Sequence, residues 1–266
     1  MEFGRTQEQA IRHRDGPMMV LAGPGSGKTT VITHRIKYLT EDCRINPSDI
    51  LVITFTRAAA EEMKERYVRL TGAARGVSFG TFHAIFFQIL KLAYRYTAQN
   101  IVRTEQQMQF IRELAGKEEL ELEDENEFVT SVLSEISSVK GEMIDLRHYY
   151  SKNCPDETFR RIFSGYEEQM RRSGLIDFDD MMVMCWQLFR ERKDILSAWQ
   201  KRYRYILIDE FQDINRLQYE IIRLIATTCL SSVTTISPST VSAAPDRRLC
   251  WDLRKIIKMQ NVFSWM

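Results

Sequence analysis

The chain has 266 residues, a length that can bury a substantial core and form one or two domains. Its composition, with 44% hydrophobic and 27% charged residues, is that of an ordinary globular protein. Its formal net charge of +1 excludes a strong overall attraction to nucleic acid. Any DNA contact must therefore come from a local patch. No stretch reaches about 18 consecutive apolar residues, and the N-terminus lacks a signal-peptide core, so we expect neither a membrane span nor export. The five cysteines and four histidines lack zinc-site spacing, which favours reduced thiols in the cytoplasm.

Short apolar runs alternate with helical patterns over the first 90 residues. The runs at residues 18–22, 50–55 and 77–80 predict strands, and each is followed by a helical spacing of apolar residues. This alternation is typical of parallel βαβ units with helices on both faces of the sheet. We therefore expect residues 1–90 to form the first part of an α/β domain.

The hydrophobic pattern is helical only from residue 91 to 173. Three stripes at helical spacing carry it: Met108, Ile111 and Leu114; Phe128, Val132, Ile136 and Val139; Phe159, Ile162, Phe163, Tyr166 and Met170. An acidic run at residues 118–127 fits a solvated face or loop. We expect an inserted all-helical subdomain, after which residues 174–226 complete the α/β domain with a strand at 205–208.

A glycine-rich segment, AGPGSGKT at residues 22–29, follows the first predicted strand and opens a helix. Its glycines allow several backbone N–H groups to point at phosphate, and the helix N-terminus adds partial positive charge. Lys28 would reach the β- and γ-phosphates, and Thr29 would bind Mg²⁺. The alternative is a glycine-rich loop that binds no ligand. It is disfavoured because the preceding strand, the loop, the Lys-Thr pair and the following helix all match the context of a phosphate-binding loop. We therefore expect a P-loop that binds ATP through Ala22, Gly23, Pro24, Gly25, Ser26, Gly27, Lys28, Thr29 and Thr30.

An acidic pair, Asp209 and Glu210, directly follows the predicted strand at 205–208. Ligands of open α/β sheets bind at the carboxyl ends of the strands, so this pair is expected beside the P-loop. Asp209 would then be a second Mg²⁺ ligand, and Glu210 would polarise the attacking water. The alternative is that both acids cap the following helix. The P-loop upstream favours the catalytic interpretation.

Several segments resemble those of the UvrD/PcrA/Rep-type superfamily I DNA helicases. In chain order they are FGRTQEQAI (3–11), TFTRAAAEEM (54–63), GTFHAIFFQIL (80–90), LIDFDDMM (175–182) and YILIDEFQDIN (205–215). The resemblance covers about residues 3–226. It implies a RecA-like α/β fold and an ATP-dependent DNA helicase that moves 3′ to 5′ along single-stranded or partly duplex DNA.

Residue roles follow from the same resemblance. Gln7 would hydrogen-bond the adenine edge, and Gln212, with Lys28 and Glu210, would belong to the catalytic group. The DNA contacts would be Phe55, Thr56, Arg57, Thr81 and His83. Stacking of Phe55 on a base fits, because aromatic stacking tolerates any sequence. Three alternatives stay open: Phe55 in the core, His83 as a hydrogen-bonding residue at a helix start, and Asp213 as a helix cap.

Residues 227–266 depart from this pattern. They are at first rich in Ser and Thr without a clear period, so we expect an irregular tail. The DNA that encodes residues 232–245 can also be read in a shifted frame, in which each codon takes the last base of one codon and the first two bases of the next. Read in this way, it can encode GDDDQSIYRFRGA, which resembles the next motif of the family. We therefore expect a frameshift near residue 226, an out-of-frame tail, and a chain that binds ATP but does not unwind DNA. The alternatives are an ATP-binding module without helicase activity and an inert product of a disrupted gene.

Overall fold

The protein divides into two compact units. The computed structural model describes residues 2–23, 25–73, 76–118, 120, 122–226, 233–236 and 261–265. The first unit combines Met1–Ile85, Arg192–Ile214 and Ile222–Met266, and the second combines Phe86–Glu191 and Asn215–Ile221. The chain thus returns to the first unit after Glu191, whereas the sequence pattern had suggested a return near residue 174.

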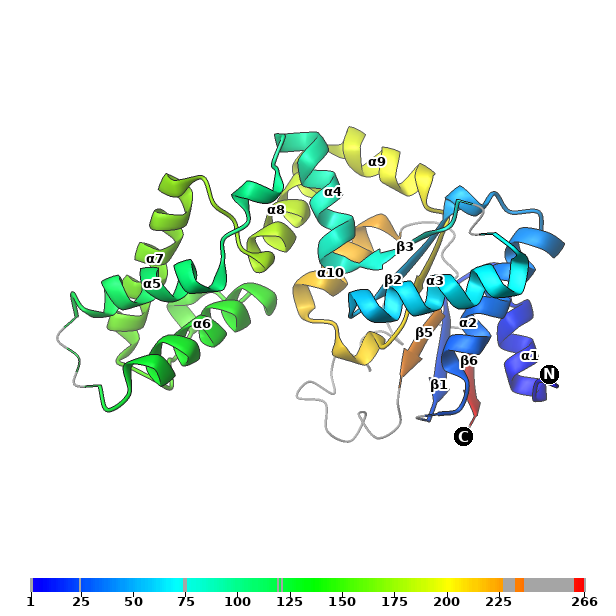
Figure 1. The fold of residues 1–266 in the computed structure, drawn as a ribbon, viewed down its shortest axis with the longest axis horizontal. Helices are drawn as coiled ribbons and strands as arrows, with labels where there is room; N and C mark the ends of the chain where they lie inside the picture. Colours follow the sequence, from blue (N-terminus) through cyan, green and yellow to red (C-terminus); the bar gives the residue numbers. More distant parts are fainter. Residues whose placement is uncertain are drawn as a thin grey trace. The chain divides into compact units, whose positions relative to one another are not determined.

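A parallel sheet forms the centre of the first unit (Figure 1). Its described strands are β1 (Met18–Ala22), β2 (Ile50–Thr54), β3 (Ser78–Thr81), β4 (Tyr205–Ile208), β5 (Val233–Ile236) and β6 (Asn261–Trp265). They lie in the order β3-β2-β4-β5-β1-β6, and each pairing is parallel. The four strands predicted before residue 226 and the α/β class are confirmed. Because the strands are parallel, the loops after β1 and β4 leave the same edge of the sheet.

The expectation of an irregular tail is wrong for two of its segments, β5 and β6. β5 pairs with β1 from Met18↔Val233 to Leu21↔Ile236 and touches β4 at Ile208↔Thr234. β6 pairs with the other side of β1. The β5 sequence, VTTI, consists of β-branched residues that favour extended backbone, and the edges of β1 offer unpaired backbone groups. The rest of the tail expectation lies outside the described residues.

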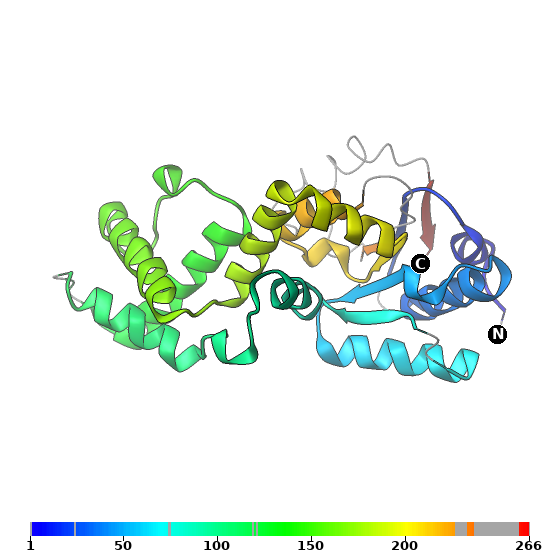
Figure 2. The same ribbon diagram turned by 90° about the horizontal axis from the view of Figure 1, so that it is seen from above.

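Helices α1 (Arg5–Arg12), α2 (Lys28–Lys37) and α3 (Arg57–Thr71) build one core with the sheet. Alternate strand residues face them, as the period of two in a strand requires. This core includes Ala10, Val31, Ile32, Ile36, Met63 and Tyr67 from the helices and Met18, Val20, Ile50, Val52 and Leu207 from the strands. α3 runs beside β2 and β3 (Figure 2). Among the described residues, this unit also contains α9 (Lys193–Arg202) and three short helical turns at Tyr38–Asp42, Pro47–Asp49 and Phe211–Asp213. α4 (Phe82–Tyr94) and α10 (Arg216–Ile225) each have residues in both units.

The second unit is helical, as predicted. Its main helices are α5 (Thr104–Ala115), α6 (Glu125–Gly141), α7 (Asp156–Ser173) and α8 (Phe178–Glu191). The three apolar stripes expected from the sequence meet in one core around Ile111, Val132, Ile136, Ile162 and Tyr166. Among the described residues, no helix combines the length and apolar character that crossing a membrane requires.

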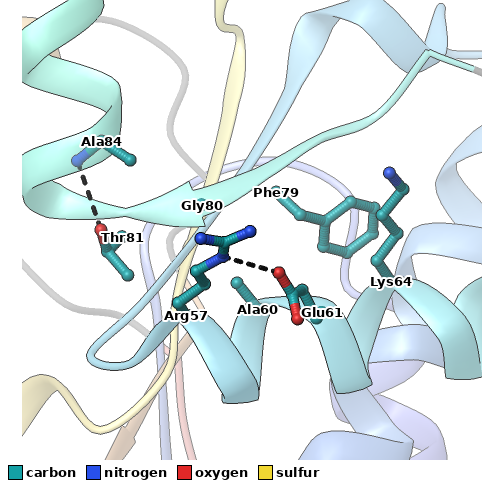
Figure 3. Close-up of a pocket in the computed structure, with 8 residues that line it drawn as sticks. All are labelled: Arg57, Ala60, Glu61, Lys64, Phe79, Gly80, Thr81 and Ala84. Atoms are coloured by element: carbon teal, nitrogen blue, oxygen red, sulfur yellow. Dashed lines mark hydrogen bonds and ion pairs between the residues drawn. The ribbon is translucent and has the colours of Figure 1, made fainter. Parts of the chain in front are cut away.

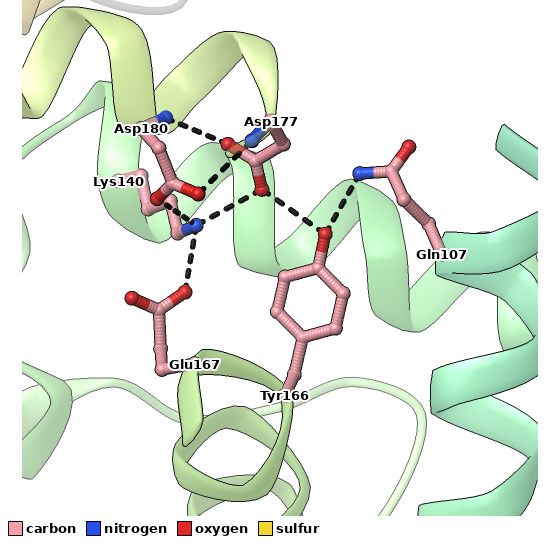
Figure 4. A network of polar contacts seen from close by, with 6 residues as sticks. All are labelled: Gln107, Lys140, Tyr166, Glu167, Asp177 and Asp180. Carbon is pink, nitrogen blue, oxygen red and sulfur yellow. Dashed lines mark hydrogen bonds and ion pairs between the residues drawn. The ribbon is translucent and has the colours of Figure 1, made fainter. Parts of the chain in front are cut away.

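A buried lysine anchors the start of α8 (Figure 4). The side chain of Lys140, on α6, is 5% exposed, and its Nζ lies 3.0 Å from Asp177 Oδ2, 2.6 Å from Asp180 Oδ1 and 2.7 Å from Glu167 Oε1. Asp177 and Asp180 also accept each other's backbone N–H, which closes the first turn of α8. One cation therefore faces three carboxylates inside the helical unit.

Tyr166 extends this network to α5. Its hydroxyl donates to Asp177 Oδ2 at 3.1 Å and accepts from Gln107 Nε2 at 2.7 Å. Burial and the nearby Asp177 raise the pKa of Asp180 to about 7, although Lys140 acts in the opposite direction. Burial also raises the pKa of Asp179 on the same turn. The cluster is thus most favourable when one of its acids carries a proton.

Candidate functional site

The glycine-rich loop between β1 and α2 has the backbone that its sequence predicts. Gly25 and Gly27 take φ values of 72° and 84°, in the left-handed region that favours glycine. Gly27 precedes the first residue of α2, and Ser26 Oγ donates to Gly23 O at 2.6 Å. Pro24 lies outside the described residues. Strand, loop and helix N-terminus are therefore arranged as an anion site requires.

Lys28 brings the loop and the acidic pair together. Its Nζ lies 3.5 Å from Glu210 Oε1, and its side chain is only 11% exposed. The same ammonium donates to Ala22 O at 3.4 Å. Glu210 follows β4 and Lys28 follows β1, so the shared carboxyl edge of the sheet creates this contact. The proximity expected from the sequence is present.

Glu210 has an unusual backbone. Its φ of 54° lies in the left-handed region, where a residue other than glycine is uncommon and such strain tends to occur at functional sites. Its Oε2 accepts from Gln212 Nε2 at 2.5 Å, and the same amide donates to Asp213 Oδ2 at 3.1 Å. Burial and the adjacent Glu210 raise the pKa of Asp213. Gln212 therefore holds both carboxylates at the end of β4.

Asp209 is buried, with 8% exposure, and its N–H donates to Ile53 O at 3.0 Å, which ties it to β2. Its carboxylate and the hydroxyl of Thr29, in the first turn of α2, are hard oxygen donors of the kind that Mg²⁺ prefers. The described residues contain no cluster of three or more His, Cys, Asp or Glu side chains that could hold a metal by itself. This donor set fits Mg²⁺ arriving with a nucleotide, since Mg²⁺ usually takes one or two carboxylates and completes its shell with phosphate and water.

The helix-cap alternatives for Glu210 and Asp213 do not fit the described contacts. Glu210 makes no side-chain cap for the short 3₁₀ helix Phe211–Asp213 that follows it. α10 is capped by Asn215, whose Oδ1 accepts from Gln218 N at 2.9 Å while Gln218 Oε1 accepts from Asn215 N at 3.1 Å. Asp213 is thus left to interact with Gln212 instead.

Gln7 lies on α1, directly against the loop. Its Nε2 donates to Ser26 O at 3.2 Å, and its Oε1 accepts from Gly4 N at 3.0 Å. The amide therefore presents both a donor and an acceptor next to the phosphate loop. The role of Gln7 in reading the adenine base stays a prediction.

The residues expected to contact DNA cluster around the ends of β2 and β3. Phe55 is 41% exposed, so the alternative that places it in the core is wrong, and its ring lies edge-on to Phe82 at 6.4 Å. Thr56 Oγ1 accepts from Ala59 N at 3.1 Å and caps α3. Thr81 Oγ1 accepts from Ala84 N at 3.2 Å in the first turn of α4.

His83 follows in the same turn of α4. Burial lowers its pKa, so the ring is neutral at physiological pH. A neutral imidazole contributes no charge to phosphate binding. It still has one hydrogen-bond donor and one acceptor.

Arg57 and Thr81 line one pocket of about 400 Å³ between α3 and β3 (Figure 3). The other lining residues are Ala60, Glu61, Lys64, Phe79, Gly80 and Ala84. Arg57 Nε donates to Glu61 Oε1 at 2.8 Å, so its charge is partly balanced. Lys64 was missed in the sequence, although its spacing of seven residues from Arg57 places both cations on one face of α3.

The parallel sheet, the glycine-rich loop before α2 and the acidic pair after β4 define the fold of the P-loop nucleoside triphosphatases. The model of the UvrD/REP helicase N-terminal domain matches residues 3–234, and the chain belongs to this family. It is 35% identical over 231 residues to the ATP-dependent DNA helicase PcrA of Leuconostoc citreum, and 37% identical over 228 residues to the putative ATP-dependent DNA helicase YjcD of Bacillus subtilis. Each match covers 83% of this chain and 30% of the relative, so the chain spans about a third of their length.

Proposed function

We propose that this chain is the ATP-binding motor region of a DNA helicase. The observation that carries the proposal is the 3.5 Å contact between Lys28 and Glu210, which joins the phosphate loop to the acid at the end of β4. The relatives are named ATP-dependent DNA helicases, which supports ATP as the nucleotide and DNA as the partner. Free Cys43, Cys154 and Cys185 support a reducing, cytoplasmic setting.

In the proposed mechanism, the backbone amides around Gly25 and Gly27 donate hydrogen bonds to the triphosphate. Lys28 leaves Glu210 and binds the β- and γ-phosphates instead. Asp209 and Thr29 would hold Mg²⁺, which neutralises phosphate charge. Glu210 orients a water and accepts its proton while the oxygen attacks the γ-phosphorus. The bond between the γ-phosphorus and the bridging oxygen breaks, and ADP leaves. Gln212 keeps Glu210 in place through its 2.5 Å hydrogen bond.

For DNA, we propose that single strands cross the face formed by Phe55, Thr56, Arg57, Thr81 and His83. Exposure of Phe55 supports base stacking, and the two cations of the α3 pocket support contact with the phosphate backbone. The 3′-to-5′ polarity and the use of partly duplex DNA rest on the family resemblance. For the 266-residue chain by itself we propose ATP binding without unwinding, since it matches only 30% of its relatives' length.

Titration with a fluorescent ATP analogue and Mg²⁺ tests the nucleotide site. We expect Lys28→Ala to abolish binding. Lys37→Ala, a change of lysine on the same helix, should leave binding intact, because Lys37 pairs with Glu41 away from the loop. Equal binding by wild type and Lys28→Ala would overturn the proposal. Strand separation or DNA-stimulated hydrolysis by the purified chain would overturn the proposal that this chain by itself does not act as a helicase.

A further inference from the structure

Arg35 is the largest fully buried side chain of the described core, with 0% exposure. It lies on α2 among Val31, Ile32 and Ile36, where the helical pattern calls for an apolar residue. Burial lowers its pKa to about 10, so it stays protonated at neutral pH. Within the described part of the chain, its Nε and one terminal nitrogen, Nη2, have no hydrogen-bond partner. A buried, incompletely paired cation destabilises a core, so the contacts that Arg35 does make require an explanation.

Those contacts all go to the end of one helix. Arg35 Nη1 donates to Ala10 O at 3.1 Å and to His13 O. Both carbonyls belong to the C-terminal end of α1, where helical carbonyls lack partners and the helix dipole favours positive charge. Arg35 therefore caps α1 from the neighbouring helix.

The other end of α1 is fastened to the same turn of α2. Phe3, just before α1, packs edge-on against His34 with ring centroids 4.7 Å apart. His34 and Arg35 are neighbours in sequence and hold opposite ends of an eight-residue helix. Gln7 lies between these two attachments and donates to Ser26 O at 3.2 Å. The position of Gln7 relative to the phosphate loop thus depends on how α1 is held on α2.

We propose that Arg35 is a positioning residue for base recognition, which keeps Gln7 beside the phosphate loop so that the site prefers adenine. The proposal rests on the nucleotide site described above and adds to it the residue that sets its base preference. Arg35 touches neither phosphate nor base in this scheme. Its loss should weaken discrimination between bases and leave triphosphate binding unchanged.

Binding of Mg²⁺-ATP, Mg²⁺-GTP and Mg²⁺-tripolyphosphate to the full chain tests this inference. The Arg35→Lys variant keeps the charge, but its side chain is shorter, so its ammonium no longer reaches the two carbonyls that Arg35 Nη1 contacts. We expect it to lower the ATP-over-GTP preference about three- to tenfold, the range for loss of one hydrogen bond, with unchanged tripolyphosphate affinity. Phe3→Ala, at the other attachment and outside the deep core, should lower the preference in the same direction. Lys37→Ala is the matched control on α2.

A double-mutant cycle with Gln7→Ala separates positioning from general stability. If Arg35 acts through Gln7, Arg35→Lys causes no further loss of base preference in the Gln7→Ala background. An undiminished effect in that background would overturn the proposal. So would a wild-type preference retained in both Arg35→Lys and Phe3→Ala, or equal binding of ATP and GTP by the wild type. Failure of the wild type to bind all three probes would instead refute the nucleotide site itself, and this proposal with it.

Discussion

Lys28 and Glu210 neutralise each other across the carboxyl edge of the sheet, with Nζ and Oε1 3.5 Å apart. In the proposed nucleotide site, an incoming triphosphate would therefore displace the carboxylate from the lysine. Replacing Glu210 with Gln removes this competition and one negative charge near the phosphates, so we expect Mg²⁺-ATP affinity to rise several-fold. Titration with a fluorescent ATP analogue measures the effect. Glu220→Gln, on α10, is the control, and weaker binding by Glu210→Gln would contradict the prediction.

Phe55 is the exposed aromatic at the end of β2. We expect Phe55→Ala to weaken single-stranded DNA binding by about 1–3 kcal/mol, because stacking of one base on one ring contributes that amount. Phe55→Trp should preserve binding. Fluorescence anisotropy with a labelled oligonucleotide gives the affinities, and Phe178→Ala, which removes a 55% exposed phenylalanine of the helical unit, is the matched control. Equal losses in both alanine variants would exclude a specific stacking site.

Lys64 shares the α3 pocket with Arg57. If this pocket holds a backbone phosphate, Lys64→Gln should weaken DNA binding equally for all sequences. The slope of log affinity against log salt should decrease by about 0.7 for a single-stranded oligonucleotide, because one fewer counterion contact is made. Lys152→Gln, a change of an exposed lysine in the helical unit, should leave the slope as it is. An unchanged slope in Lys64→Gln would remove this pocket from the DNA path.

Asp180 makes the stability of the helical unit depend on pH. Its pKa is raised from 3.8 to about 7 in the folded protein, so the native state holds a proton that the unfolded state releases. Stability from this group is present below about pH 4 and is lost as the pH rises through 7, by at most a few kcal/mol. Between pH 5 and 8, the melting temperature of the wild type should fall as the pH rises, whereas that of Asp180→Asn should change little. Asp145→Asn is the control, since Arg147 holds the pKa of Asp145 far below this window. A wild-type slope retained in Asp180→Asn would contradict the assignment.

The codons of residues 232–245 test the frameshift. The shifted reading of GDDDQSIYRFRGA requires, for example, a final G in the codons of Ser232, Val233 and Thr234. DNA sequencing of this region should find those bases. Codons with other third bases at these positions would make the tail an in-frame sequence and contradict the prediction.

The sequence predicted those parts of the protein in which the pattern is local. β1, β2 and the phosphate loop depend on apolar runs and glycines within a few residues, and the helical stripes each depend on one helix. The meeting of the phosphate loop and the acidic pair at one edge of the sheet was also predictable, because parallel strands place their carboxyl ends together. Exposure of Phe55 was not, since a phenylalanine at the end of an apolar strand fits burial as well as stacking.

Other features depend on pairings between distant segments. α1 is mostly polar and buries only Ala10 and Ile11, so its pattern gave no helix signal. The roles of Arg35 and Lys140 have no local sequence signal, because their partners lie far away in sequence. β5 and β6 took strand positions in a tail without periodicity, because the edges of β1 were available for pairing.

At Glu210, the backbone conformation that lowers stability and the side chain proposed for catalysis belong to the same residue. Glycine adopts φ near 54° without steric cost, whereas this conformation destabilises any other residue by about 1 kcal/mol or more. Glu210→Gly should therefore raise the free energy of unfolding and remove the proposed general base. Selection for thermal stability alone would favour glycine at this position, and the proposed role of the carboxylate in ATP hydrolysis would be the reason to keep glutamate.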